Sequence, residues 1–486
     1  VLLPPGSPLP SAEPSPSPSA EGSGLLSLPW EMCVITVLPQ VCHALGNVGK
    51  DSTAWQLRAR RLTGPRASFP VGPRDGFDWP SACLEMEELI ACWTGQGERA
   101  AREAEQAERE REVERAQERE RDREALAEEG IGEWEEVEEG RPQVDEGVEE
   151  VEERVGVLAD RDGQDYIAGP RLGREGERNG SSRAPSPPPA LERLSLPSGH
   201  IAEVNSVLLV GGDEAVCASG SRDRNVNLWD LRDGGSTGRL LHTLGGQGLF
   251  STHKGWVWCL AARGPLLASG SFDSTVRLWD LGAQGAERGL IRARVPCSAW
   301  PSPEGRAAGG TYDKKVSVYD TRVAEPLVKS LRLHSNAVLC LVADEQYILS
   351  GSKDRTVVIY DRRAGKTLQK LQLSSYLLSM CYSDSEVWAG DNRGMLHAFS
   401  MQAGFFKPLS QFDVGHTSLV TGIHRSPGSL YTCSADRTIK VHLPCSPPRT
   451  LCTLHHQAGV NGLSVEAGVL AIASGEMCVE VWRARR

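Results

Sequence analysis

The sequence lacks the local patterns that mark most enzymes and metal proteins. Its 13 cysteines form no C-x-x-C pair, and there is no glycine-rich phosphate loop, no nucleophile elbow and no His/Cys cluster at metal-ligand spacing. Zinc modules, thioredoxin-like redox sites and the common nucleotide-binding motifs are therefore not expected. We predict a binding protein that needs no cofactor and no metal, and not an enzyme.

Long apolar runs and an excess of positive charge are also missing. No stretch of about 18 uncharged apolar residues could span a bilayer, and the segment from Leu25 to Leu45 lacks the basic start of a secretory signal. The net charge of −11 disfavours nucleic-acid binding driven by counterion release, so a protein partner is expected. Unpaired cysteines of this kind indicate a reducing compartment, the cytosol or the nucleus.

Composition divides the region before residue 190 into four segments. Residues 1–23 are rich in Pro and Ser and are predicted to be disordered. Residues 65–97 are predicted to form a short helical extension with an amphipathic helix from Trp79 to Trp93. Residues 98–189 begin with Glu, Arg, Ala and Gln without a coiled-coil seam, then become acidic. This last segment is predicted to be a charged helix and linker that holds two domains apart, the alternative being a partner-binding acidic tail.

A repeated pattern fills residues 190–486. Ser-Gly-Ser-x-Asp, five variable residues and Trp-Asp recur with a period of about 40 residues. A histidine also stands 20 residues before the acidic residue in four copies. The acidic residues of the seven copies are Asp223, Asp273, Asp313, Asp354, Asp391, Asp436 and Glu476.

This combination resembles the WD-repeat family. Each copy fits four short antiparallel strands, and seven copies stacked radially predict an all-β seven-bladed propeller. The resemblance implies a hydrogen-bonded set of His, strand hydroxyl, turn Asp and Trp within each blade, with a structural and not a catalytic role. Its expected members are His253, Asp273, Trp279, His334, Asp354, His416 and Asp436.

Two features of the ring follow from the spacing of the copies. The third and fifth blades lack the histidine, and the sixth has His442 where Trp is expected, so these blades should have incomplete sets and be less stable. The last copy ends four residues after Trp482 without an outer strand, and we expect residues 191–200 to supply it.

Residues 24–64 resemble a shortened F-box. They contain Leu-Pro-Trp-Glu-Met near residue 30, Leu-Pro-Gln-Val-Cys near residue 40 and Trp55, but the stretch between Met32 and Leu38 is shorter than in the family. An F-box followed by a WD propeller is the layout of the F-box/WD-repeat substrate receptors of SCF-type ubiquitin ligases. The resemblance implies the Skp adaptor, the cullin and a protein substrate as partners, with ubiquitin transfer performed by other subunits. The expected adaptor-binding residues are Leu28, Pro29, Trp30, Met32 and Val41.

A second function remains open: a WD-repeat scaffold whose shortened F-box no longer joins the ligase. In either case the ligand is expected on the face formed by two repeated positions, the residue before each turn Asp and the fifth residue after each His. These positions hold Arg222, Phe272, Tyr312, Lys353 and Ala435, together with Asn205, Trp258, Leu339, Thr421 and Asn461.

The composition of this face predicts the kind of ligand. Family members that bind phosphorylated peptides carry an arginine cluster there, because guanidinium pairs with phosphate through two hydrogen bonds. This chain offers only Arg222 and Lys353, beside Trp258, Phe272 and Tyr312. We therefore expect an aromatic-anchored peptide site of modest charge, unless the rings pack against neighbouring blades.

Overall fold

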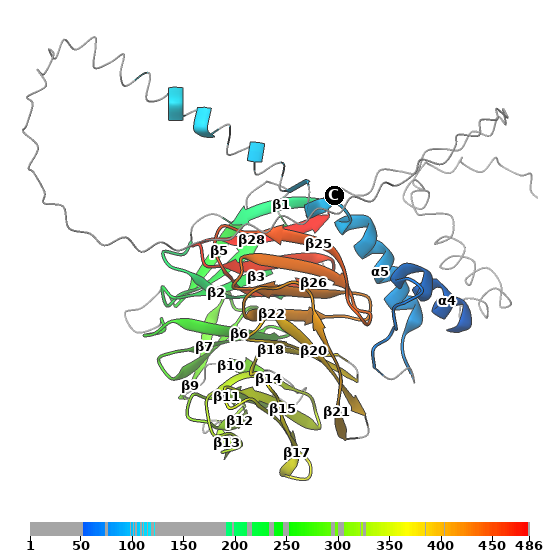
Figure 1. Cartoon of the computed structure of the whole chain (residues 1–486). Helices are drawn as coiled ribbons and strands as arrows, with labels where there is room; N and C mark the ends of the chain where they lie inside the picture. The colour runs from blue at the N-terminus through cyan, green and yellow to red at the C-terminus, as the bar shows by residue number, and fades with distance from the viewer. Residues whose placement is uncertain are drawn as a thin grey trace, which may run out of the picture. The chain divides into compact units, whose positions relative to one another are not determined.

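The computed structural model of the chain consists of a propeller with two helices packed on its edge (Figure 1). The residues that it describes are 52–72, 76–97, 99–100, scattered positions from 102 to 121, 191–196, 199–210, 216–232, 238–245, 252–292, 297–299, 306–320, 322–323, 327–383, 385–402 and 404–484.

Seven four-stranded antiparallel sheets form the blades. Blade 1 contains β2 (Val204–Val210), β3 (Val216–Ser221), β4 (Val226–Asp230) and β5 (Arg239–Leu244). Blade 2 contains β6 (Val257–Arg263), β7 (Leu266–Ser271), β8 (Thr275–Asp280) and β9 (Ala286–Arg292). Blade 3 contains β10 (Cys297–Ala299), β11 (Arg306–Gly310), β12 (Val316–Asp320) and β13 (Leu327–Leu331). Blade 4 contains β14 (Val338–Ala343), β15 (Tyr347–Ser352), β16 (Thr356–Asp361) and β17 (Lys366–Gln372).

The remaining blades follow in chain order, except for the outer strand of the last. Blade 5 contains β18 (Leu377–Ser383), β19 (Glu386–Asp391), β20 (Met395–Gln402) and β21 (Phe405–Asp413). Blade 6 contains β22 (Val420–Arg425), β23 (Leu430–Ser434), β24 (Thr438–Leu443) and β25 (Arg449–His455). Blade 7 contains β26 (Val460–Glu466), β27 (Val469–Ser474), β28 (Val479–Ala484) and β1 (Leu191–Leu196). The predicted seven-bladed propeller is confirmed.

The tight turn between the second and third strands explains why the repeats carry Asp there. The residue after the turn Asp has a left-handed backbone in five blades, for example Arg224 with φ of 75° and Arg437 with φ of 68°. This conformation costs energy for a residue with a side chain. The Asp offsets the cost, because its Oδ1 accepts the N–H two residues further on, as Asp436 does from Thr438 at 2.9 Å.

The ring closes through an outer strand taken from the start of the repeat region. β1 pairs antiparallel with β28, from Leu191 opposite Ala484 to Leu196 opposite Val479. Leu194 and Leu196 are buried in the core between blades 7 and 1. Arg193 Nε also donates to Glu480 Oε2 at 3.2 Å. The expectation that residues 191–200 supply the missing strand is confirmed for 191–196.

Two helices pack against blades 6 and 7. α4 spans Ser52–Thr63, and α5 spans Trp79–Trp93, beginning after Asp78, whose side chain accepts the N–H of Ser81 at 3.2 Å. The buried face of α5 joins the same core cluster as β23 and β28, where Trp93 contacts Tyr431 and Trp482. α4 is held on α5 through the buried Trp55 and Ala59.

A carboxylate on α5 fixes this packing. Glu85 accepts hydrogen bonds from the Ser429 hydroxyl and the Gly428 N–H, both at 2.7 Å, and from the Ser426 hydroxyl. The hairpin approaches the helix so closely that a Cβ on Gly428 would lie 2.5 Å from Ala82 O. A residue with a side chain at 428 would therefore force the helix away from the blade.

The charged segment is not a spacer between the helices and the propeller. α4, α5 and all seven blades lie in one compact unit, whereas residues 105–186 form a second unit. Residues 98–189 therefore do not separate α4 and α5 from the propeller, since the contacts of α5 with blades 6 and 7 are made before the chain enters that segment. The expectation that they hold the F-box-like region apart also concerns residues 24–51, which lie outside the described part of the chain. Described positions between 102 and 121 are helical, with Glu105 and Arg109 paired.

Deleting residues 190–198 tests ring closure. Loss of β1 would expose the β28 edge and the apolar core beneath Leu194 and Leu196, so thermal unfolding followed by circular dichroism should shift to lower temperature and lose cooperativity. An equally long deletion within the charged segment, residues 150–158, should leave the transition unchanged. Coinciding transitions for the two deletions would contradict the closing role of β1.

Candidate functional site

A chain of hydrogen bonds crosses each of the first two blades. In blade 2, His253 Nδ1 lies 3.1 Å from Asp273 Oδ2, His253 Nε2 lies 2.7 Å from Ser269 Oγ, and Trp279 Nε1 donates to the same hydroxyl at 2.8 Å. Blade 1 repeats the arrangement with His200, Ser219, Asp223 and Trp229. Blade 4 has the His334 contacts, 3.3 Å to Asp354 and 2.8 Å to Ser350, with Tyr360 in the Trp position.

The chemistry of these groups fixes the direction of each bond. A carboxylate only accepts and an indole N–H only donates, so His253 Nδ1–H donates to Asp273 and the Ser269 hydroxyl donates to His253 Nε2. Burial works to raise the pKa of Asp273, but the bonds from His253, Thr275 and the Lys254 N–H outweigh it and lower the pKa. The Ser269 hydroxyl already forms two hydrogen bonds, and His253 is buried. These hydrogen bonds therefore connect strands within the blade and leave no free nucleophile among the four residues.

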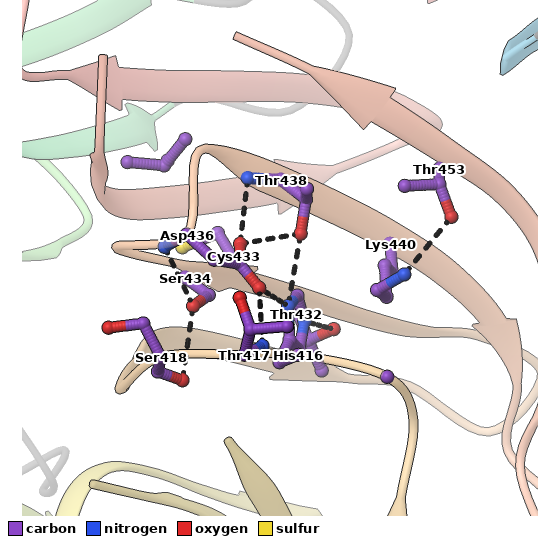
Figure 2. A network of polar contacts seen from close by, with 12 residues as sticks. His416, Thr417, Ser418, Thr432, Cys433, Ser434, Asp436, Thr438, Lys440 and Thr453 are labelled. Atoms are coloured by element: carbon purple, nitrogen blue, oxygen red, sulfur yellow. Dashed lines mark hydrogen bonds and ion pairs between the residues drawn. The ribbon is translucent and has the colours of Figure 1, made fainter. Parts of the chain in front are cut away.

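In blade 6 a threonine takes the place of the serine between histidine and the third strand, and Figure 2 shows His416 beside Thr432 and Asp436. His416 Nδ1 lies 2.9 Å from Asp436 Oδ2, and Thr432 Oγ1 replaces the serine hydroxyl at 2.9 Å from His416 Nε2. His442 Nε2 lies 3.0 Å from Thr432 Oγ1, where the indole bonds in blades 1 and 2, and its Nδ1 lies 2.9 Å from Thr450 Oγ1. The expected gap at His442 is therefore wrong, because an imidazole supplies the N–H that Trp would have donated.

Blade 5 departs from the repeat more than expected. Asp391 lies opposite Leu377, which is the strand-end position that Ser352 occupies opposite Val338 in blade 4, so it is not the turn residue. It is buried and accepts from the Ser375 hydroxyl at 2.6 Å, with His397 Nε2 at 3.0 Å. The assignment of Asp391 as a turn Asp is wrong, since the blade builds its polar set two residues earlier.

Blade 7 has the histidine and the tryptophan but not the hydroxyl between them. Ile472 lies opposite Glu480, the place that Ser350 takes opposite Val358 in blade 4. His456 Nε2 and Trp482 Nε1 are consequently buried without a hydrogen-bond partner. His456 Nδ1 is 3.5 Å from Glu480 Oε2. A buried unpaired polar group costs about 1–3 kcal/mol, so this blade depends on β1 and α5 for its stability.

The expected ligand face lies at the Asp-turn end of the blades. A cavity of about 460 Å³ opens at the centre of the ring and is lined by Arg222, Trp258 and Tyr312 among the predicted residues. It is also lined by Asn205, Leu339, Thr421 and Asn461 from the second predicted position. Phe272 and Lys353 are exposed but do not line this cavity. The helices contact the opposite end of blade 6, at the turn after β22, because consecutive hairpin turns alternate between the two ends.

Three of the predicted positions connect neighbouring blades. Thr421 Oγ1 donates to Val460 O at 2.6 Å. Asn461 Nδ2 donates to Val204 O, and Asn205 Nδ2 donates to Val257 O, both at 2.9 Å. The donors of these side chains hold blades 6, 7, 1 and 2 to one another, so they are less available to a ligand than the residue types suggest.

An exposed row of rings crosses blades 2 and 3. The centroid of Phe272 lies 6.0 Å from that of Trp256 and 6.1 Å from that of Tyr312. Trp256, which is 46% exposed and precedes Trp258 by two residues, was not among the predicted residues. The signal that could have identified it was the pair of tryptophans in His253-Lys-Gly-Trp-Val-Trp.

Arg222 lies at one end of the row. Its guanidinium is 5.1 Å from the ring of Trp256, and it forms an ion pair with Glu203 at 2.7 Å. Arg222 Nε also donates to Asn205 Oδ1 at 3.3 Å. The charge of this guanidinium is therefore paired with Glu203, and one of its faces lies on the Trp256 ring.

Comparison with known proteins agrees with this geometry. The family model "WD domain, G-beta repeat" matches residues 192–230, 239–280, 325–361 and 406–442. F-box/WD repeat-containing protein 9 of Bos taurus is 40% identical over 482 residues, covering 96% of this chain and 84% of that protein. The chain belongs to the F-box/WD repeat-containing protein family. Its similarity to the Homo sapiens protein of the same name is 38% identity over 473 residues, covering 95% of this chain and 82% of that one.

A more distant member shows a shorter match. F-box/WD repeat-containing protein mec-15 of Caenorhabditis elegans is 25% identical over 298 residues, covering 58% of this chain and 72% of that protein. The predicted adaptor-binding residues lie outside the described part of the chain. Within the described part, no group of three His, Cys, Asp or Glu residues is placed to hold a metal, and no helix is long and apolar enough to cross a membrane.

Replacing Ile472 tests the unpaired groups of blade 7. Val and Thr have the same shape, and a buried Val→Thr exchange ordinarily destabilises because the hydroxyl loses water. Here the Thr hydroxyl would meet both His456 Nε2 and Trp482 Nε1, as Thr432 does in blade 6. Ile472→Thr should therefore unfold with a free energy about 1 kcal/mol higher than Ile472→Val, measured by denaturant titration. If Ile472→Thr were less stable than Ile472→Val, the missing hydroxyl would not be what leaves His456 and Trp482 unpaired.

Acidification tests His442. Burial lowers its pKa to about 3, helped by the nearby His416 and Lys440, whereas an unfolded chain has a histidine pKa of about 6.5. Below about pH 6.5 only the unfolded chain gains this proton, so stability is lost at about 1.4 kcal/mol per pH unit as the pH falls toward 3. Between about pH 7 and pH 5, the unfolding free energy of the chain should fall by about 2 kcal/mol more than that of His442→Gln. Parallel profiles would count against this assignment.

Proposed function

We propose that the chain is the substrate-recognition subunit of an SCF-type ubiquitin ligase. In this proposal the F-box residues Leu28, Pro29, Trp30, Met32 and Val41 bind the Skp adaptor, and the propeller face binds the protein substrate. The observation that carries the proposal is the position of α4, which ends the F-box-like region. It is packed through α5 onto blades 6 and 7, at the opposite end of the blades from the exposed rings.

This arrangement supports a receptor that holds its substrate-binding propeller in a fixed orientation relative to α4 and α5. Glu85 binds the turn between β22 and β23 through three hydrogen bonds, and Arg58 on α4 binds Glu87 on α5, with Nη2 2.8 Å from Oε2. A second contact joins Gly72 N–H to Glu386 Oε1 at 2.6 Å, where Glu386 also pairs with the buried Arg425. A substrate on the propeller would thus be held at a fixed distance from the adaptor, which raises its effective concentration near the transferring subunits.

The chain contributes no chemical step in this proposal. The buried His, Ser and Asp residues of the described blades form hydrogen bonds between strands. Among the described residues that line the cavity at the centre of the ring, Arg222 is the one charged residue. The relatives that cover the chain are F-box/WD repeat proteins. Ubiquitin transfer is assigned to the other subunits.

We propose a cytosolic or nuclear location for the protein. Burial raises the pKa of the thiols of Cys217, Cys340 and Cys433 to about 12, which keeps them protonated and unreactive. The cysteines of the described residues are free, as a reducing compartment would leave them.

Adaptor capture tests the proposal. The chain carrying a C-terminal tag should recover the Skp adaptor and the cullin from cells, and Leu28→Asp combined with Met32→Asp should abolish both because the apolar contact is lost. Leu57→Asp, on the exposed side of α4 (58% exposed), is the matched control and should retain them. Absence of both partners, with their return when a full-length F-box is inserted, would instead establish a propeller scaffold outside the ligase.

A further inference from the structure

The exposed rings of blades 2 and 3 form a continuous apolar surface. Trp256, Phe272 and Tyr312 are 46%, 62% and 45% exposed, and each ring contacts the next at about 6 Å between centroids. Isolated exposed apolar residues are ordinary, but a contiguous row of rings marks an interaction surface. Phe272 and Tyr312 contact each other across blades 2 and 3 but remain 62% and 45% exposed, so packing between blades covers only part of their surface.

The apolar surface continues into the centre of the ring. Tyr312 and Trp258 line the central cavity together with the half-buried Leu339, Leu378 and Leu419. On the remaining side of this cavity, the polar lining residues Thr421, Asn461 and Asn205 already donate to neighbouring blades. The mouth of this cavity can therefore bury an apolar side chain of a ligand at a lower desolvation free energy than a polar one.

Charge on this face does not favour a phosphate. Arg222 is the one charged residue among the described lining positions, and its guanidinium is paired with Glu203 and covered by Trp256. A phosphate would have to displace that carboxylate. Cationic side chains stand near the rings along the chain, among them Lys254, two residues before Trp256, and Lys353, at the matching position of the blade after that of Tyr312. Both are exposed, and neither side chain forms an ion pair with another described residue.

We propose that the propeller binds an unphosphorylated extended peptide with two large apolar side chains and an acidic residue beside them. One apolar side chain enters the central cavity between Trp258 and Leu339, and the second lies on Phe272 and Tyr312. The acidic residue faces Lys353. This inference rests on the proposed function only for calling the peptide a substrate segment; the binding itself needs the propeller alone.

Selection from a random library tests the chemistry of the ligand. The full chain, immobilised by its C-terminal tag, is used to select displayed short peptides, and the selected sequence is then made as a fluorescein-labelled probe for anisotropy titration. We expect enrichment of peptides with two apolar residues flanked by Asp or Glu. Phe272→Ala and Trp258→Ala should each weaken the probe by about tenfold, because a buried aromatic anchor carries a large share of binding energy.

Two controls separate the apolar and the charged contributions. Phe405→Ala removes a phenylalanine that is 76% exposed on β21, away from this face, and should leave binding unchanged. Lys353→Glu should weaken the acidic probe severalfold but not its Asn or Gln counterpart. A phosphoserine replacing the acidic residue should bind no more than about twice as tightly as the acidic probe.

The results discriminate this inference from the proposed function. Enrichment of peptides without the apolar pair, no enrichment, equal binding by Phe272→Ala, or strong preference for the phosphopeptide would each overturn the inference. Adaptor capture by Phe272→Ala, expected to equal that of the unmodified chain, reports on the proposed function separately. Peptide binding without adaptor capture would retain the inference and overturn the ligase assignment.

Discussion

The whole structure depends on closing a ring of sheets whose faces are apolar. No blade can bury both faces alone, and the last would leave β28 as a bare edge beside a core of Val and Leu. β1 removes that edge by pairing along its full length with β28. Its strand lies at the start of the repeats and its partner at their end, so closure joins residues almost 300 positions apart.

The blades show how one polar network tolerates substitution. An indole, a phenol and an imidazole occupy the same place in blades 2, 4 and 6, and a serine or a threonine supplies the central hydroxyl. The indole and the imidazole meet that hydroxyl, whereas the Tyr360 hydroxyl accepts a hydrogen bond from Lys329 Nζ at 2.7 Å. The network keeps its contact between histidine and hydroxyl in all three blades. It fails in blade 7, where Ile472 gives no acceptor and two buried N atoms stay unpaired. The helices pack against this blade and its neighbour. The blade whose hydrogen-bonded set is incomplete is therefore also the blade that shares an apolar core with α5.

Features repeated along the chain could be predicted from the sequence, and features that occur once could not. The pattern of Ser-Gly-Ser-x-Asp predicted the number of blades because it recurs in seven strong or weaker copies, and the spacing of His253 from Asp273, which recurs in three other copies, supported the strand pattern. The contact of Glu85 with Gly428 has no such signal, because it joins residues 343 positions apart through a single approach of helix and hairpin. Trp256 was missed for a related reason: the matching position holds a different kind of residue in each blade, from Glu203 and Ala337 to Tyr376 and Leu419, so no repeated signal marks it. The predicted adaptor-binding residues lie outside the described part of the chain, so their role stays a prediction.

The place of the charged segment gives the chain an unusual connectivity. Residues 105–186 connect α5 to β1 in the sequence, and α5 and β1 are each held on the propeller by contacts that do not involve this segment. A protease that cut the backbone there would therefore produce two polypeptides that stay together as one particle. The fragment that contains α4 and α5 would remain attached through Glu85 and the buried face of α5, so the backbone connection is not what holds these helices on the propeller.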